Sequence, residues 1–324
     1  EQSRFRSTKG GSTIEGGHMG NVIETENLIK IYGQTPAVDR VSLHVPKGSI
    51  YGLLGRNGAG KTTTMRMLLN LIRPNSGTIL LFGDDHRSNS GASYRRVGSI
   101  IETPGFYENL TGRENLHLIA RLRGLHRGDA VGRALEIVGL EGETDKTFSS
   151  YSLGMKQRLG IAAAVMHEPE LLILDEPING LDPIGIHEIR GFLLALSRER
   201  GTTILVSSHV LSEVEQIADI IGVMHEGRLL EETDLAELYR RNRQYVELET
   251  SDARAAAWVL ERQCGVSDYT VCDGRVIRIY GRIGDRGAIN RSLVESGMLV
   301  TKVNVSEDTL EDYFTELIGG GGIG

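Results

Sequence analysis

Short apolar runs alternate along the chain with segments whose apolar residues recur at helical spacing. Residues 49–54 form one such run and predict a buried strand. A glycine-rich stretch follows, after which apolar residues recur at i, i+3, i+4 and i+7 from Met65 and predict a helix that ends before the breaker cluster at 73–77. Strands that alternate with helices in this way are typical of an α/β protein.

The same pattern continues to about residue 231 and predicts a mixed sheet with helices around it. Strands are expected at 22–30, 41–45, 49–54, 77–82, 97–101, 171–174 and 202–207, helices at 111–140, 153–166, 186–200 and 211–218, and a strand pair at 220–224 and 228–231. Residues 171–174 are all apolar, which predicts a central strand covered on both faces. Ligands of such sheets bind at the carboxyl ends of strands. Asp175, Glu176 and His209 directly follow strands and are therefore candidate site residues.

A charged and polar stretch at 232–244 interrupts this pattern and predicts a helical linker. Beyond it, strands are expected at 245–250, 269–273, 276–280 and 299–305, with helices at 253–262, 286–296 and 309–318. This β-α-β-β-α-β order is that of ferredoxin-like domains, so residues 245–318 are expected to form a small α+β accessory or regulatory domain. Residues 1–20 resemble an expression leader with a cloning scar, and residues 319–324 are expected to be a disordered tail.

The composition narrows the possible functions. The chain has 324 residues and a net charge of −7, so it lacks a global basic field for nucleic acid. Its longest apolar runs are too short to span a bilayer, and no secretory signal is visible. Cys264 and Cys272 fit no zinc spacing and are interpreted as reduced cytosolic thiols. A role at a membrane would therefore require docking onto another chain.

Residues 55–62 read G-R-N-G-A-G-K-T and match the phosphate-binding pattern G-x-x-x-x-G-K-T. Glycines let the backbone adopt positive φ and approach a phosphate closely, and the start of the following helix offers free N–H groups. Lys61 can reach the β- and γ-phosphates, and the Thr62 hydroxyl can bind Mg²⁺. A glycine-rich turn that binds nothing is the alternative. The strand before the loop and the helix after it favour phosphate binding.

Five motifs in a fixed order resemble those of the nucleotide-binding domain of ABC transporters, over residues 22 to about 231. They are the phosphate loop 55–62, the signature-like segment 152–157, the acidic strand 171–176, the turn 179–182 and the segment 207–209. The resemblance implies a P-loop ATPase domain at 21–231 with a helical subdomain at about 103–168. It also implies ATP and Mg²⁺ as ligands.

The resemblance assigns roles to single residues. Glu176 would act as general base on the attacking water, a role worth about 10²–10⁴-fold in rate, and His209 would hydrogen-bond the γ-phosphate. Asp175 would hold Mg²⁺ through water, together with Thr62. Tyr32 would stack on adenine, although a tyrosine that simply packs at a strand end is the alternative.

The signature segment implies a second copy of the chain. In the family, its serine and its helix N-terminus bind the γ-phosphate of ATP held by the other subunit. Ser152 and Gly154 are therefore expected to complete the partner's site in a head-to-tail homodimer, with Asp182 at the interface, while Ser152 can also cap its own helix. The nucleotide-binding residues implied are Tyr32, Gly55, Arg56, Asn57, Gly58, Ala59, Gly60, Lys61, Thr62, Thr63, Ser152, Gly154 and Asp182.

Some positions depart from the usual family pattern. Leu153 and Met155 replace a glycine and the glutamine of the L-S-G-G-Q signature, a form shared by exporter ATPases of the bacitracin, lantibiotic and daunorubicin type. Glu102 stands where most members have a glutamine that contacts Mg²⁺ and the attacking water, so it is expected to act both in catalysis and as a metal ligand. The aromatic residues within 104–116 would face a permease or pack internally.

The resemblance implies the ATPase subunit of a bacterial ABC-2-type exporter that protects against an antimicrobial peptide, lantibiotic or bacitracin-like, or against a drug. The subunit would lie in the cytoplasm, peripheral at the inner face of the cell membrane, bound to transmembrane permease subunits. One alternative is an ABC ATPase that acts on nucleic acid or the ribosome, which the lack of a basic patch and of a second nucleotide-binding domain disfavours. Another is a nucleotide sensor without turnover, which the presence of Lys61, Glu176 and His209 disfavours.

Overall fold

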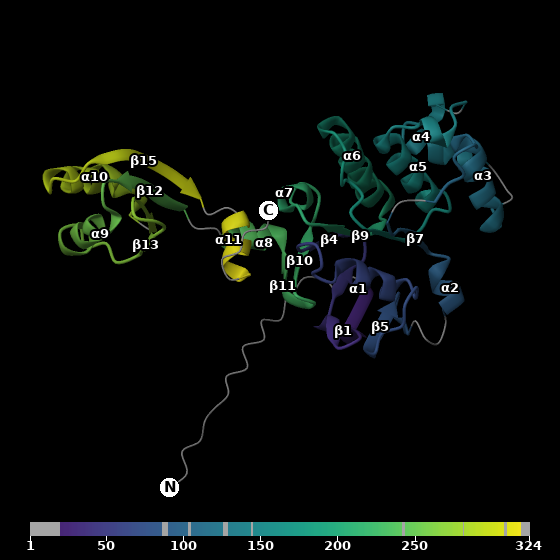
Figure 1. The fold of residues 1–324 in the computed structure, drawn as a ribbon, viewed down its shortest axis with the longest axis horizontal. Coiled ribbons are helices and arrows are strands. Elements are labelled where there is room, and N and C mark those ends of the chain that lie inside the picture. The colour runs from purple at the N-terminus through teal and green to yellow at the C-terminus, as the bar shows by residue number, and fades with distance from the viewer. Residues whose placement is uncertain are drawn as a thin grey trace, which may run out of the picture.

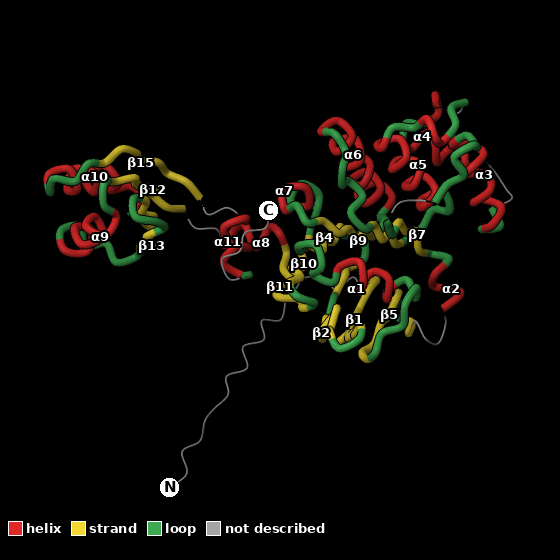
Figure 2. The backbone as a smooth tube through the Cα atoms, viewed as in Figure 1, coloured by secondary structure: helices red, strands yellow, loops and turns green. Residues whose placement is uncertain are grey.

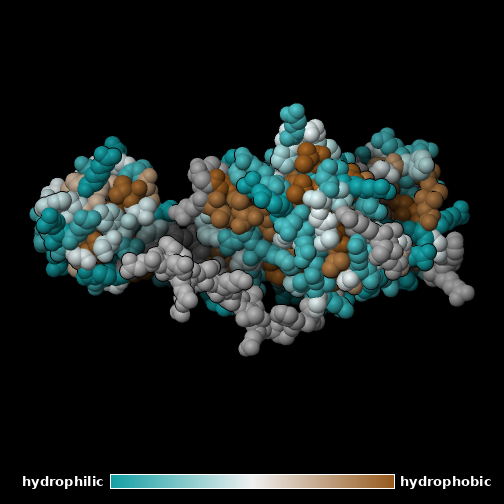
Figure 3. Space-filling view, turned by 90° about the horizontal axis from the view of Figure 1, so that it is seen from below, coloured by the Kyte–Doolittle hydropathy of each residue, from teal (hydrophilic) through white to brown (hydrophobic). Residues whose placement is uncertain are grey.

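The computed structural model describes residues 20–85, 90–102, 105–125, 129–143, 145–241, 244–280, 282–307 and 310–318. The expected leader, apart from its last residue, and the expected tail at 319–324 lie outside these ranges. In the described ranges, no helix is both long enough and apolar enough to cross a bilayer. On the face seen in Figure 3, polar side chains cover most of the surface and the apolar patches stay separate.

A six-stranded sheet forms the centre of the larger domain, residues 20–241. Its order is β11-β10-β4-β9-β8-β7, and every neighbouring pair is parallel except β10 with β11. The strands are β4 (Ile50–Leu54), β7 (Val97–Ile100), β8 (Leu171–Leu174), β9 (Thr203–Ser208), β10 (Ile220–His225) and β11 (Arg228–Asp234). All residues of β4, β8 and β9 are buried, as expected for central strands covered on both faces. The predicted mixed sheet is confirmed.

A second, antiparallel sheet contains β1 (Asn21–Tyr32), β2 (Thr35–Val41), β3 (His44–Pro46), β5 (Ser76–Leu81) and β6 (Asp84–Asp85). The prediction of one strand at 41–45 was wrong, because β2 ends at Val41 and β3 begins at His44. Strand β2 was missed because Pro36 and the charged pair Asp39–Arg40 hide its alternation, and Arg40 has a φ of 55°. Val38 and Val41 nevertheless reach the core.

Helices lie on both faces of the central sheet, α1 on one face and α5, α6 and α7 on the other (Figure 1). The helices of the larger domain are α1 (Lys61–Leu68), α2 (Ser90–Tyr94), α3 (Gly112–Leu122), α4 (Ala130–Ile137), α5 (Leu153–Val165), α6 (Pro183–Arg200), α7 (Leu211–Val214) and α8 (Leu235–Arg241), with short 3₁₀ turns at Glu141–Glu143 and Phe148–Ser150. Helix α1 lies between the two sheets, and its Met65 shares a cluster with Leu53 of β4 and Ile79 of β5. It ends earlier than predicted, at Leu68.

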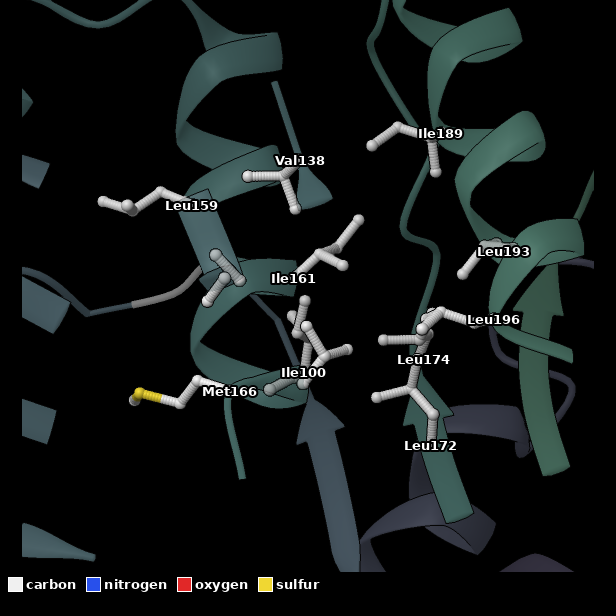
Figure 4. Packing of buried hydrophobic residues seen from close by; sticks show 14 of the residues in the cluster. Ile100, Val138, Leu159, Ile161, Met166, Leu172, Leu174, Ile189, Leu193 and Leu196 are labelled. Atoms are coloured by element: carbon white, nitrogen blue, oxygen red, sulfur yellow. The ribbon is translucent and has the colours of Figure 1, made fainter. Parts of the chain in front are cut away.

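Helices α5 and α6 pack against the face of β8 that carries Leu172 and Leu174. Figure 4 shows Ile161 of α5 together with Leu193 and Leu196 of α6, close to Leu172 and Leu174 of β8. Burial of each such side chain contributes about 1.5–3 kcal/mol. This cluster fixes the level at which β8 ends, and thereby the position of the acidic residues that follow it.

The C-terminal domain, residues 244–307, forms a separate sheet at one end of the molecule (Figures 1 and 2). Its elements are β12 (Gln244–Thr250), α9 (Ala253–Arg262), β13 (Tyr269–Val271), β14 (Val276–Tyr280), a 3₁₀ turn at Ile283–Asp285, α10 (Arg286–Glu295) and β15 (Val300–Glu307). The strand order is β13-β14-β12-β15, and all three pairs are antiparallel. Helices α9 and α10 cover the face that carries Val246 and Ile277.

Helix α11 (Leu310–Leu317) returns to the larger domain, although the sequence placed it in the C-terminal one. Its Leu310 and Phe314 pack in a cluster with Leu54 of β4, Val214 of α7 and Leu238 of α8. The expected linker at 232–244 likewise belongs largely to β11 and α8. The chain therefore leaves the larger domain after α8, forms the C-terminal sheet and comes back to the same face (Figure 1).

Candidate functional site at the carboxyl edge of the central sheet

The segment between β4 and α1 is an open loop that the backbone of its glycines makes possible. Gly58 and Gly60 have φ values of 85° and 102°, a region that other residues rarely adopt. A Cβ atom on Gly60 would lie 2.5 Å from the carbonyl oxygen of Ala37, so a side chain would not fit there. The loop tip, residues 56–58, is exposed. The free N–H groups at the start of α1 can therefore meet an anion from solvent.

Lys61 lies beneath this loop. The residue is 4% exposed, and its Nζ donates to the carbonyl oxygens of Gly55 and, at 3.3 Å, Arg56. The same Nζ lies 3.3 Å from Oε1 of Glu176. A buried ammonium needs such partners. A phosphate oxygen can take the place of any of these oxygens as an acceptor for the Lys61 ammonium.

The acidic residues lie beside Lys61 because β8 and β9 are neighbours in register. Leu174 pairs with Val206, so the two strands end at the same edge of the sheet. Oε2 of Glu176 lies 2.6 Å from Nδ1 of His209. Glu176 has a φ of 49°, which is costly for a non-glycine residue. The contacts around Glu176 must therefore stabilise this backbone conformation.

Hydroxyl and carboxylate oxygens near the loop fit a magnesium ion. Thr62 lies in the first turn of α1 and Asp175, 8% exposed, follows β8. Across the described ranges, no three His, Cys, Asp or Glu side chains gather closely enough to hold an ion on their own. Magnesium in nucleotide enzymes binds one or two carboxylates together with phosphates and water. This sparse donor set therefore fits a metal that arrives with a nucleotide.

Glu102 lies apart from the Lys61–Glu176 pair. It follows β7 with a φ of 64°, and its side chain, 66% exposed, forms an ion pair with Arg66 of α1. The two residues after it, Thr103 and Pro104, lie outside the described ranges. Arg66 was not among the sequence candidates, since nothing in the helical pattern of α1 singled it out.

The remaining nucleotide-binding candidates occupy helix starts and a strand end. Ser152 caps α5, where its Oγ accepts from the N–H of Met155 at 3.2 Å, and Asp182 caps α6. Gly154 lies close to the turn before α6. Tyr32 ends β1, is 51% exposed and has the Lys30 ammonium 5.2 Å from its ring centre. No contact found among the described residues joins Ser152, Asp182 or Tyr32 to the phosphate loop.

The aromatic residues after Glu102 divide between the two expected roles. The ring of Phe106 packs on Phe148 at 5.0 Å inside the helical part of the domain. Tyr107 is 65% exposed. Internal packing therefore accounts for the first ring, and the second is available at the surface.

Ser207 is a site residue to which the sequence assigned no role. Its buried Oγ lies 2.6 Å from Oδ1 of Asp175 and accepts from the N–H of Glu176 at 2.9 Å. The sequence offered one indication of this role. Ser207 lies two residues before His209, in a strand that was expected to neighbour the strand ending at Asp175 and Glu176.

The chain is similar to known proteins over most of its length. The family described as ABC transporter matches residues 38–179. The chain is 63% identical over 302 residues to the bacitracin transport ATP-binding protein BcrA of Enterococcus faecalis, covering 93% of this chain and 98% of that one. It is 53% identical to the protein of the same name from Bacillus licheniformis, covering 94% and 100%. A solved structure titled as the ATP-binding subunit of an ABC transporter shares 32% identity with a TM-score of 0.61, covering 68% and 92%.

Proposed function

Because the chain belongs to the ATP-binding subunits of ABC transporters, and is thus an ATP-hydrolysing enzyme, we propose that it powers export of a bacitracin-like peptide antibiotic. Two relatives named for bacitracin transport match it over nearly their whole length. Export of such a peptide gives resistance or self-protection to the cell. The observation that carries the hydrolytic part is the cluster of Lys61, Glu176 and His209 beneath the phosphate loop.

The chemistry follows from what each residue can hold. The N–H groups of residues 55–63 and the Lys61 ammonium bind the β- and γ-phosphates. Glu176 accepts a proton from the attacking water, and His209 orients the Glu176 carboxylate and hydrogen-bonds the γ-phosphate. When bound, Mg²⁺ would supply positive charge that stabilises the charge developing on the phosphates. Thr62 and Asp175 are the residues that would hold it. Glu102, which pairs with Arg66 of α1 in this structure, would join them in this proposal once that pairing opens.

A second copy of the chain completes the site in this proposal. The start of α5, with Ser152 and Gly154, binds the γ-phosphate held by the partner copy, and Asp182 lies at the contact. Support comes from the exposure of two apolar side chains beside these residues, Leu153 at 53% and Ile184 at 70%. Exposed apolar groups rimmed by polar ones suit an interface.

The transport path lies in a different polypeptide. The subunit is proposed to sit in the cytoplasm against the inner face of the membrane, with Tyr107 among the residues that meet the permease. Tyr32 stacks on adenine in the same proposal. The peptide itself is expected to contact only the permease subunits.

A resistance assay tests the proposal. The chain is expressed with the permease subunits of a bacitracin transporter in a sensitive bacterium, and the inhibitory concentration of bacitracin is measured. The wild-type chain is expected to raise it, and Glu176→Gln is expected to leave it at the level of cells without the transporter. Equal resistance with both chains, or none with either while the authentic ATPase subunit restores it, would contradict the proposal.

A further inference from the structure

One buried hydroxyl joins the two acidic residues of the site. Ser207 is fully buried at the end of β9. Its Oγ lies 2.6 Å from Oδ1 of Asp175 and 2.9 Å from the backbone nitrogen of Glu176. A serine hydroxyl has one hydrogen to donate and two lone pairs to accept with. Here the hydrogen goes to the Asp175 carboxylate and a lone pair takes the Glu176 N–H.

Both contacts act on groups that need an external constraint. The Asp175 carboxylate is 8% exposed, so a fixed donor holds the carboxylate in one orientation where water cannot. Glu176 has a φ of 49°, and a left-handed conformation costs a non-glycine residue about 1–3 kcal/mol unless its surroundings stabilise it. The hydrogen bond from the Glu176 N–H to Ser207 is such a stabilising contact.

The neighbouring Ser208 shows that this arrangement is specific to the position. The Ser208 hydroxyl donates to Glu213 at 2.9 Å and accepts from the N–H of Val210 at 2.9 Å. It therefore organises the turn into α7, while Ser207 organises the acidic end of β8. Of the two adjacent serines, one faces the site and the other does not.

We propose that Ser207 is a positioning residue that presets the Asp175 carboxylate for the nucleotide-bound metal and holds the Glu176 backbone in its catalytic conformation. The inference rests on the proposed roles of Asp175 and Glu176. Groups that orient a metal ligand typically change metal affinity or activity by about 10–100-fold when they are removed. Loss of the Ser207 hydroxyl therefore weakens binding of the metal–nucleotide pair, while binding of the metal-free nucleotide is unaffected.

The test compares affinity for a fluorescent, non-hydrolysable ATP analogue, mant-AMPPNP, in Mg²⁺ and in EDTA. The ratio of the two dissociation constants is the metal-dependent gain. Ser207→Ala is expected to reduce this gain about tenfold, with an unchanged affinity in EDTA and an unchanged melting temperature. Ser207→Thr keeps the hydroxyl and is expected to keep the gain. The matched control is Thr203→Val, which removes another fully buried hydroxyl of β9, one that accepts from the N–H of Gly48 at 2.9 Å.

The outcomes separate this inference from the proposed function. Asp175→Asn is the reference: if it keeps the full metal-dependent gain, the proposed role of Asp175 fails. If Asp175→Asn loses the gain and Ser207→Ala keeps it, only the role of Ser207 is overturned. An equal loss in Thr203→Val would also overturn it, since any buried hydroxyl would then suffice. Should Ser207→Ala not fold, Ser207→Thr decides, because loss of the gain in a folded variant that retains the hydroxyl contradicts the inference.

Discussion

The larger domain and the C-terminal domain bury very different side chains. Within the described residues, the larger domain buries Lys61 and Asp175 together with hydroxyl groups such as that of Ser207, whereas the C-terminal domain buries a single polar residue, Thr250. Burial of a charge is unfavourable unless it is paired. The larger domain buries these two charged groups together with partners, and in the proposed function they bind phosphate and metal. The described part of the C-terminal domain has no charged residue of comparable burial.

The charged groups of the C-terminal domain lie instead at its surface. Lys302 pairs with Glu247 at 2.9 Å, and the lysine side chain is 52% exposed. Exposed pairs of this kind contribute about 0–1 kcal/mol. Its core is aliphatic, with Leu248, Leu260 and Ile279 all fully buried. An aliphatic core with charged groups at the surface is typical of a domain without a catalytic site. We therefore expect substitutions in the larger domain, and not in the C-terminal domain, to abolish ATP hydrolysis.

The largest expected effect is that of Glu176→Gln. The change keeps size and removes the base, so the rate of phosphate release should fall about 10²–10⁴-fold while nucleotide affinity is kept. Steady-state phosphate release and mant-ATP binding measure the two properties. The matched control is Glu168→Gln, which alters an exposed glutamate that also has a positive φ, 55°, at the opposite end of β8. An equal rate in wild type and Glu176→Gln would defeat the assignment.

Phe314→Ala tests which domain α11 stabilises. Phe314 is fully buried against the larger domain, so truncation should lower the free energy of unfolding of that domain by about 3–5 kcal/mol. Circular dichroism follows the whole chain, whereas the fluorescence of Trp258, the only tryptophan, follows the C-terminal domain. The urea concentration at the unfolding midpoint should fall when measured by circular dichroism and should be unchanged when measured by Trp258 fluorescence. Leu122→Ala, at a residue 87% exposed, is the control. Equal shifts in both signals would show that α11 serves the two domains alike.

Glu102→Gln is expected to have a smaller effect. An amide binds Mg²⁺ less strongly than a carboxylate, so the Mg²⁺ concentration for half-maximal ATPase should rise, with nucleotide affinity in EDTA retained. Arg66→Ala leaves the carboxylate in place and should not raise that concentration. An unchanged ATPase rate together with unchanged transport in Glu102→Gln would remove this residue from the mechanism.

The smallest expected effect is a dependence of the stability of the folded chain on pH, through His167. Burial, with Arg123 close by, lowers the pKa of His167 to about 4. The folded chain therefore favours neutral His167, and its stability falls as the pH drops from about 6.5, the ordinary histidine pKa, towards 4. His167→Gln should reduce the loss of melting temperature across this range. His167 lies in the larger domain, and all nine histidines precede residue 226. The unfolding transition of the C-terminal domain, followed by Trp258 fluorescence, should therefore not change with this substitution. An identical pH profile in wild type and variant would contradict the assignment.

The order of the elements and the edge at which the polar residues gather could be predicted from the sequence. Residues 171–174 are uniformly apolar, and a strand of that kind lies in the centre of an α/β sheet, where both of its faces are covered. The phosphate loop was equally clear, because glycine spacing and flanking periodicity agree. The comparisons confirm the family and the α/β ATPase fold.

Features set by tertiary contacts could not be predicted. The return of α11 depends on which apolar surface its Phe314 meets, and helical periodicity shows only that a face is apolar. The division between β2 and β3 depends on tertiary pairing, because Val41 lies opposite Leu28 of β1 and His44 lies opposite Glu24 of the same strand. The role of Ser207 depends on a register between strands 32 residues apart, which local sequence does not encode.

The most direct test of the central claim is a structure of Glu176→Gln with Mg²⁺ and ATP. We expect the triphosphate in the loop 55–62, with Lys61 at its β- and γ-phosphates and Ser152 of a second copy at the γ-phosphate. A triphosphate bound anywhere other than over Lys61 would contradict the account.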